Sequence, residues 1–295
     1  EDYSYFFNKI SKMIDEPIGD SSLLPTFIVF DKVKKHTNVS IGGDGGDENF
    51  FGYITFDAFY LALKIKKFVP RIVFKIISKI LKVIPNSSNY MSLSFKLKKF
   101  FQSINYQKKY INTFWLSPLT LNELESYFKE KINLEKILPE LDELFSKKKT
   151  NIKLCQLYYF KYYLPMVLSK VDKASMFNSV ESRSPFLGKN IINFSLDPDF
   201  EKNYKFLKNK NFIKKIFSKE IPSIIKNKKK HGFALPLSEF FKDEKNIYKY
   251  LEKKYIYNES FFESKLDLAK NGDLNAQKYI WNELILNLSI QNNNV

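Results

Sequence analysis

The stretch that most constrains this chain is IGGDGGDEN at residues 41–49. It holds four of the nine glycines of the 295-residue sequence, and three carboxylates, Asp44, Asp47 and Glu48, lie among them. A short uncharged strand is expected at 38–41, and a helix is expected to start near Asp47. The order of strand, glycine loop and helix is typical of an α/β nucleotide-binding sheet.

The mixture of glycine and acid indicates a specific chemistry. Glycines allow positive φ and close approach of a ligand, and free N–H groups at a helix N-terminus attract phosphate. Carboxylates would repel phosphate, but Mg²⁺ binds one or two carboxylates and bridges to phosphate oxygens. Asp44, Asp47 and Glu48 have the i, i+3, i+4 spacing of one helix face. No Lys-Ser or Lys-Thr pair follows, which excludes a Walker A loop, and an ordinary tight turn with solvated acids remains the alternative.

The chain is strongly basic, with a formal net charge of +16. Only Arg71 and Arg183 are arginines, so the charge comes almost entirely from lysine. Proteins that read nucleic acids favour arginine for its bidentate geometry and stacking. We therefore expect a solvated lysine surface and no nucleic-acid partner.

The cysteine and histidine content excludes several classes of site. Cys155 is the single cysteine, so an internal disulfide framework is impossible, and we expect a small buried side chain in a reducing, cytoplasmic setting. His36 and His231 are the two histidines, which argues against Ser-His-Asp catalysis and histidine-rich zinc sites. The first residue is Glu1, which suggests a fragment or a processed chain.

Helical patterns dominate after about residue 55. The range 71–84, between two prolines, carries Arg71, Lys75, Lys79 and Lys82 opposite an apolar stripe of isoleucine, valine and leucine. We expect this helix to pack on the core, with a membrane surface as the alternative. No uninterrupted apolar run is long enough to cross a membrane. The other expected helices are 3–14, 23–35, 92–104, 120–129, 134–147, 151–164, 166–178, 208–219, 236–243, 246–256, 260–270 and 274–290.

Two further stretches carry candidate binding residues. VDKASMFNSVESRSPFLG (171–188) contains Arg183, which either pairs with a ligand carboxylate or phosphate or forms a salt bridge to Glu181 or Asp172. KKKHGFALPLSEFF (228–241) places lysines before a glycine loop. A lysine there either reaches a pyrophosphate or belongs to a solvated basic loop.

Four motifs, in order, resemble the C-terminal synthetase domain of the glutamine-dependent asparagine synthetases. The family patterns are DEP-x-x-D-x-S, SGDGGDELFGGY, VDRASM-x-x-SLE-x-R-x-PFLD and K-x-G-F-x-x-P. The counterparts here are DEPIGDSS, IGGDGGDENFFGY, VDKASMFNSVESRSPFLG and KHGFALP. The resemblance implies an α/β fold: the end of a parallel-sheet ATP pyrophosphatase (HUP-like) domain at 1–60, followed by a mostly helical part at 61–295.

The resemblance also implies an activity and its residues. ATP activates the side-chain carboxylate of aspartate as an acyl-adenylate with release of pyrophosphate, and ammonia from a glutaminase site then displaces AMP. Gly42 and Gly43 match residues that contact the nucleotide, and Asp44 matches an acid near the reacting carboxylate and ammonia. Asp47 matches the acid associated with Mg²⁺ and pyrophosphate. Lys230 matches a lysine that stabilises pyrophosphate and transition-state charge.

Departures from the family pattern keep alternatives open. The family Ser, Leu, Gly, Arg and Asp are replaced here by Gly42, Asn49, Phe51, Lys173 and Gly188. The chain contains neither the family's SGG-x-D-S loop nor a glutaminase domain, so alone it is expected neither to adenylate aspartate nor to hydrolyse glutamine. The alternatives are amidation of another carboxylate such as a sugar acid, an inactive remnant, and a basic protein that binds nucleic acid or membrane through 64–82. A homodimer is compatible with the sequence.

Overall fold

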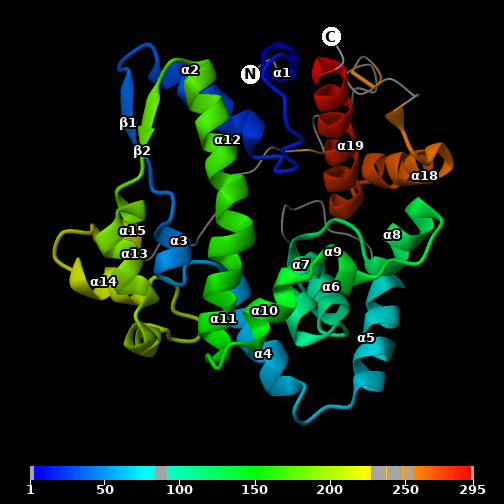
Figure 1. Cartoon of the computed structure of the whole chain (residues 1–295), viewed down its shortest axis with the longest axis horizontal. Coiled ribbons are helices and arrows are strands. Elements are labelled where there is room, and N and C mark those ends of the chain that lie inside the picture. Colours follow the sequence, from blue (N-terminus) through cyan, green and yellow to red (C-terminus); the bar gives the residue numbers. More distant parts are fainter. Residues whose placement is uncertain are drawn as a thin grey trace.

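The computed structural model describes residues 3–83, 92–226, 237, 248, 250–251 and 255–293. Within these residues the fold is α/β, mostly helical around a small parallel sheet (Figure 1). The helices of the first half are α1 (Tyr3–Ser11), α2 (Leu23–Val33), α3 (Gly46–Asn49), α4 (Ile54–Ile65), α5 (Arg71–Val83), α6 (Leu93–Ser103), α7 (Ile111–Leu116) and α8 (Leu121–Phe128). Those that follow are α9 (Leu134–Ile137), α10 (Glu140–Ser146), α11 (Asn151–Tyr158), α12 (Leu164–Phe177), α13 (Lys189–Leu196), α14 (Asn211–Ile216), α15 (Ser223–Lys226), α18 (Glu259–Lys270) and α19 (Leu274–Asn293).

The sheet has two described strands, which come from distant parts of the chain. β1 (Val39–Ile41) confirms the predicted strand and pairs in parallel with β2 (Glu181–Arg183), with Val39 opposite Glu181. β2 was not predicted, since Glu-Ser-Arg has no β-branched or aromatic residue. Its extended form comes from pairing with β1, and this pairing brings the 171–188 motif beside the glycine loop.

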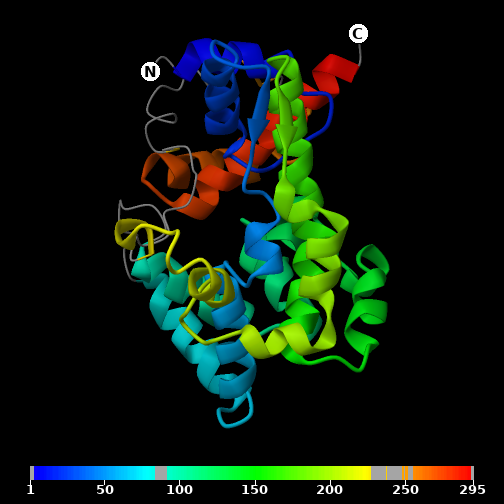
Figure 2. The same ribbon diagram turned by 90° about the vertical axis from the view of Figure 1, so that its left-hand side faces the viewer.

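Two hydrophobic cores hold the helices together. The first combines α1, α2, α12, α18 and α19 and buries Phe7, Phe27 and Trp281 completely, so it joins the two ends of the described chain. The second is built from the middle of the chain around Phe56 and Tyr159. The views of Figures 1 and 2 agree that α1, α2 and α19 lie at one end and α4 lies at the other.

One long helical rod spans both cores. The predicted helices 151–164 and 166–178 are continuous here, because α11 passes through a π-helical turn, η2 (Tyr159–Tyr163), directly into α12. Pro165 falls in the first turn of α12, directly after the π-helical turn, and it has no N–H to donate to that turn. Tyr159 belongs to the second core and Ala174 to the first, so the rod fixes the two cores relative to each other.

Other predicted helices differ in extent. The range 134–147 divides into α9 and α10, with Pro139 before the start of α10. The range 208–219 shortens to α14. Most of 236–243 and 246–256 lies outside the described residues. Cys155 is fully buried, as predicted, and accepts a hydrogen bond from the Asn112 amide at 3.4 Å.

The prediction that the apolar stripe of α5 packs on the core is wrong for its isoleucine row. Phe74 is its buried side chain, 2% exposed, and it contacts the ring of Phe101 in α6. Ile72, Ile76 and Ile80 point to solvent instead. The reason is geometric: α5 packs on α6 through the face that carries Phe74, which turns the isoleucine row away. No described helix is long and apolar enough to cross a membrane.

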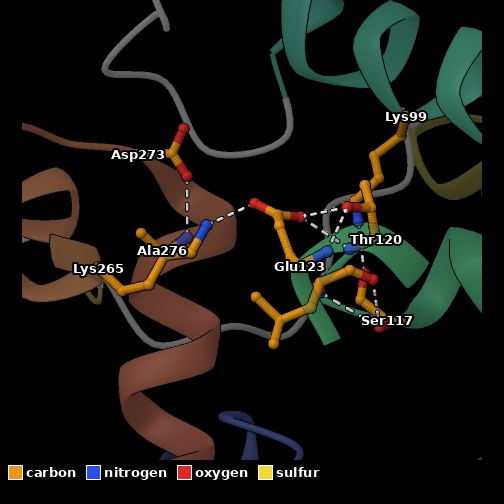
Figure 3. Close-up of polar contacts among 8 residues, drawn as sticks. Lys99, Ser117, Thr120, Glu123, Lys265, Asp273 and Ala276 are labelled. Carbon is orange, nitrogen blue, oxygen red and sulfur yellow. Dashed lines mark hydrogen bonds and ion pairs between the residues drawn. The ribbon is translucent and has the colours of Figure 1, made fainter. Parts of the chain in front are cut away.

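A polar cluster links the middle helices to the C-terminal helices (Figure 3). Glu123 completes a capping box with Thr120 at the start of α8 and also forms an ion pair with Lys265 of α18. Lys99 of α6, only 4% exposed, donates a hydrogen bond to the carbonyl oxygen of Ser117. Asp273 accepts from the backbone N–H of Ala276 at 2.8 Å in the first turn of α19.

Candidate functional site

The glycine loop follows the end of β1 and is shaped by backbone contacts. The N–H of Gly42 donates to the carbonyl oxygen of Arg183 at 2.8 Å, which extends the sheet by one bond. Gly45 has φ of 82°, and a Cβ at this position would lie 2.3 Å from Leu187 Cδ2. Both its conformation and the close approach of Leu187 therefore require glycine.

Two side chains fix the loop from its buried side. Asn49 is fully buried, and its amide donates to the carbonyl oxygens of Gly45 at 2.7 Å and Phe186 at 2.9 Å. The Ser195 hydroxyl in turn donates to the Asn49 side-chain oxygen. The family leucine at this position could make none of these bonds. Asn49 is thus a structural replacement that clamps the glycine loop to the 185–195 segment.

The next layer comes from α11. The Gln156 amide donates to the carbonyl oxygens of Glu48 at 3.2 Å and Asn49 at 3.3 Å. Lys153 donates to the carbonyl oxygen of Ser195 at 3.1 Å and to Gln156 at 3.1 Å. Burial lowers the pKa of Lys153 to about 8, with Glu201 acting in the opposite direction. Short helix α3 is therefore held by a hydrogen-bond network with a positive charge behind it.

Glu48 does not share a face with the two aspartates, contrary to the helical spacing. Its residue is 1% exposed, and its carboxylate accepts a hydrogen bond from the Tyr53 hydroxyl at 2.7 Å. Burial and the Glu48 charge raise the pKa of Tyr53, which keeps the phenol protonated as the donor. The spacing rule assumes a regular helix, but α3 starts only at Gly46, so Asp44 precedes it.

Asp44 and Asp47 are partly exposed and lie on the other side of the loop from its buried anchors. The Ser184 hydroxyl donates to Asp44 at 3.3 Å. Asp47 forms an ion pair with Lys210, with the nitrogen 3.1 Å from the carboxylate oxygen, and its side chain is 23% exposed. A Cβ at position 52 would lie 1.8 Å from the Asp47 carboxylate, so Gly52 leaves the space that Asp47 occupies.

Lys210 was not predicted to lie at the glycine loop, yet it contacts Asp47 there. It precedes α14, 163 positions after Asp47, and it has a left-handed backbone with φ of 53°. No motif marks it, because it is one lysine in a lysine-rich segment. The Lys210 side chain lies beside the start of α3, since a Cβ added at Gly46 would be 3.6 Å from Lys210 Nζ.

Other sequence-derived candidates have structural partners. Arg183 pairs with Glu181 at 2.9 Å, with both side chains exposed, which is one of the salt bridges foreseen for it. Lys173 pairs with Asp15 of the DEPIGDSS loop. Lys230 and the rest of KHGFALP lie outside the described residues.

Substitutions relative to the family pattern also act at the loop. A Cβ at Gly42 would lie 2.9 Å from the Asp44 carboxylate, so a serine there would contact this acid and its neighbour Ser184. Gly43 is exposed, and a Cβ added to it would meet no other described atom within 4 Å. The backbone around Gly43 is therefore open to a ligand.

The donor set limits the kind of metal site. The described residues hold no group of three or more His, Cys, Asp or Glu side chains placed to bind a metal. A site made wholly of protein ligands is therefore absent from this part of the chain. Mg²⁺ typically takes one or two carboxylates together with substrate phosphates and water. Asp44 and Asp47 are partly exposed carboxylates beside an open glycine backbone, and they fit that requirement.

Comparisons with known proteins agree with the motifs. A family model described as asparagine synthase matches residues 1–291. Asparagine synthetase (glutamine-hydrolyzing) 1 of Bacillus subtilis is 26% identical over 250 residues, which cover 83% of this chain and 38% of the relative. A protein of Mycobacterium bovis named putative asparagine synthetase (glutamine-hydrolyzing) is 23% identical over 232 residues, covering 78% of this chain and 34% of the relative. No solved structure matches the chain.

Proposed function

Since the chain belongs to the asparagine synthase family, we propose that it supplies the synthetase site of an ATP-dependent carbon–nitrogen ligase. The chain spans about 38% of the length of the Bacillus relative. The complete reaction is therefore proposed for the protein of which this chain is part: aspartate, ATP and glutamine-derived ammonia give asparagine, AMP and pyrophosphate.

One observation carries the proposal: two aspartates remain partly exposed on a loop that is otherwise held by buried hydrogen bonds. Glu48 and Asn49 anchor the loop from its buried side, while Asp44 and Asp47 stay at the accessible side. A rigid backbone with accessible carboxylates favours binding of a magnesium–phosphate group, because preorganised groups lose little entropy on binding.

Each residue then has a defined role. Gly42 and Gly43 contact the nucleotide, and Asp47 would hold Mg²⁺, which would neutralise phosphate charge when bound. Asp44 lies one turn earlier and faces the reacting carboxylate and ammonia. Lys230 stabilises pyrophosphate, and we assign Lys210 as a second cation near Asp47, since its nitrogen is already 3.1 Å from that carboxylate.

A second candidate keeps the chemistry and changes the acceptor. Asn49 and Gly42 replace family residues in the loop itself, and Gly188 replaces the last residue of the PFLD motif. These changes favour screening other carboxylates, such as sugar acids, beside aspartate.

The test is ATP–pyrophosphate exchange measured with the native protein purified from its own cells. We expect exchange that depends on one carboxylate substrate and falls about 100-fold or more in Asp44→Asn and Asp47→Asn, a typical loss for a group that stabilises transition-state charge. Asp31→Asn, which removes a surface ion pair to Lys9, is the matched control and should retain the wild-type rate. Exchange that survives both loop substitutions would contradict the proposal.

A further inference from the structure

Helix α5 presents a continuous apolar row to solvent. Ile72, Ile76 and Ile80 recur every four residues and are 60%, 51% and 60% exposed. Phe68, 78% exposed, lies before the helix, and Val83, 83% exposed, ends it. Single exposed apolar residues are ordinary, but a row of this length on one helix indicates a binding surface.

The row is not the result of a loosely attached helix. Phe74, on another face of α5, is 2% exposed and belongs to the second core. Its ring centroid lies 6.5 Å from that of Phe101 in α6. The helix is therefore anchored on one side, and the isoleucine row is directed outward by that anchor.

The charge along the sequence that contains this helix is of one sign. Residues 58–122 contain twelve of the 48 basic residues of the chain and none of its 32 acidic residues. Arg71, Lys75 and Lys79 are exposed, and each precedes one isoleucine of the row by one position. Exposed Lys64 and Lys67, near the end of α4, extend the positive surface.

We propose that α5 is a docking surface for an anionic lipid bilayer. The isoleucine row would enter the acyl–headgroup boundary while Arg71, Lys75 and Lys79 contact anionic headgroups, the arrangement of an interfacial amphipathic helix. A nucleic acid would use the charges but has no use for three adjacent isoleucines. Figure 1 shows α5 far from β1 and β2, so the surface is separate from the candidate site.

Co-sedimentation of the full 295-residue chain with vesicles tests the surface. Phosphatidylglycerol–phosphatidylcholine vesicles should retain the chain, and pure phosphatidylcholine vesicles should retain much less. Combined Ile72→Ser, Ile76→Ser and Ile80→Ser should weaken partitioning about tenfold or more, and the single Ile76→Ser change should weaken it less. Combined Lys75→Gln and Lys79→Gln should weaken it by a similar factor and flatten its salt dependence.

Helix α14 offers matched controls, because it also carries lysines and an exposed isoleucine. Ile216 is 54% exposed, a fraction similar to the 51% of Ile76, and Lys214 and Lys215 are also exposed. Ile216→Ser, and Lys214→Gln with Lys215→Gln, should leave partitioning unchanged. The proposal would be overturned if the α14 and α5 variants lost vesicle binding equally, or if the chain showed no preference for anionic vesicles. It would also be overturned if the α5 variants changed duplex DNA binding or oligomeric mass without changing vesicle binding.

Discussion

Two lysine–aspartate pairs show how differently this chain uses the same chemistry. Lys170 of α12 and Asp20 of the DEPIGDSS loop form a largely buried pair at 2.9 Å, with side chains 9% and 18% exposed. Lys210 and Asp47 form a pair at 3.1 Å beside the glycine loop, with side chains 36% and 23% exposed. Both aspartates lie in family motifs, so motif membership alone does not separate a structural acid from a ligand-binding acid.

The surroundings make the difference. Lys170 also donates to the Ser22 hydroxyl at 2.6 Å, and the Ser22 N–H donates to Asp20 at 2.9 Å, which closes a small internal network. Burial alone would raise the pKa of Asp20, but Lys170 and Ser22 together hold it below its usual value. At the glycine loop, the internal bonds are made by Glu48 and Asn49, and Asp44 and Asp47 stay at the accessible side. The polar groups around Asp20 therefore bind one another, whereas the glycine loop is held from its buried side and leaves Asp44 and Asp47 accessible.

The largest expected effect is on the closed pair. Lys170→Met should lower the free energy of unfolding by about 3–5 kcal/mol, because it leaves the Asp20 carboxylate buried without its cation. Urea denaturation at neutral pH measures this. Lys173→Met is the matched control: its partner Asp15 is 62% exposed, so the loss should stay below about 1 kcal/mol. Equal losses in the two variants would remove the distinction between a closed and an open pair.

The second-largest effect on stability is expected at Asn49, which holds the glycine loop from its buried side. Asn49→Leu restores the family residue, yet we expect it to lower the free energy of unfolding by about 2–3 kcal/mol. The Phe186 carbonyl loses its side-chain donor in a buried place, and the Gly45 carbonyl keeps only the backbone N–H of residue 49. Thermal unfolding followed by circular dichroism is the measurement. Asn190→Leu, at an exposed position of α13, should have little effect. A variant as stable as wild type would show that the loop does not depend on this clamp.

The same lysine-to-methionine change should have the opposite sign at Lys99. This buried amine donates to the Ser117 carbonyl oxygen. Burial is the main cause that lowers the pKa of Lys99 to about 7, and the charges of Lys278 and Lys265 lower it further. The carboxylates of Glu123 and Asp273 act in the opposite direction. The unfolded chain therefore keeps a proton between pH 7 and about 10.5 that the folded chain loses, so stability rises with pH across this window.

Lys99→Met should therefore stabilise the chain by about 1–3 kcal/mol near pH 7, and the gain should shrink toward about pH 10. Urea denaturation at both pH values measures the difference between the variant and wild type. Lys98→Met, at the next position of α6, is the control, and its stability should stay near that of wild type. A destabilised Lys99→Met variant would mean that this lysine is paired as tightly as Lys170.

Local patterns predicted much of this fold. The strand at 38–41, the helix start near Asp47 and several amphipathic helices follow from periodicity and turn residues, which act over a few positions. β2 and the continuous rod through Pro165 were missed, because pairing with β1 and packing against two cores override weak local preferences. The exposure of the α5 row also could not be read from its pattern, since periodicity shows that a face is apolar without showing what covers it.

The candidate site follows the same division. Gly42, Gly43, Asp44 and Asp47 were predicted as site residues from the mixture of glycine and acid and from the family resemblance; they lie on one loop, and their roles stay predictions. Glu48 was assigned to the same face but points inward, because the helix begins after Asp44. Lys210 could not be found, since its approach to Asp47 depends on a contact across 163 positions of sequence.

The most direct test of the comparison is a titration of Mg²⁺–pyrophosphate into this chain, followed by calorimetry at a temperature where all variants are folded. Asp47→Asn should weaken binding about tenfold or more and change the free energy of unfolding by less than about 1 kcal/mol. Asp20→Asn should lower stability and leave binding unchanged. Equal weakening by the two variants, or wild-type binding in Asp47→Asn, would contradict the account of an open, ligand-binding acid beside a closed, structural one.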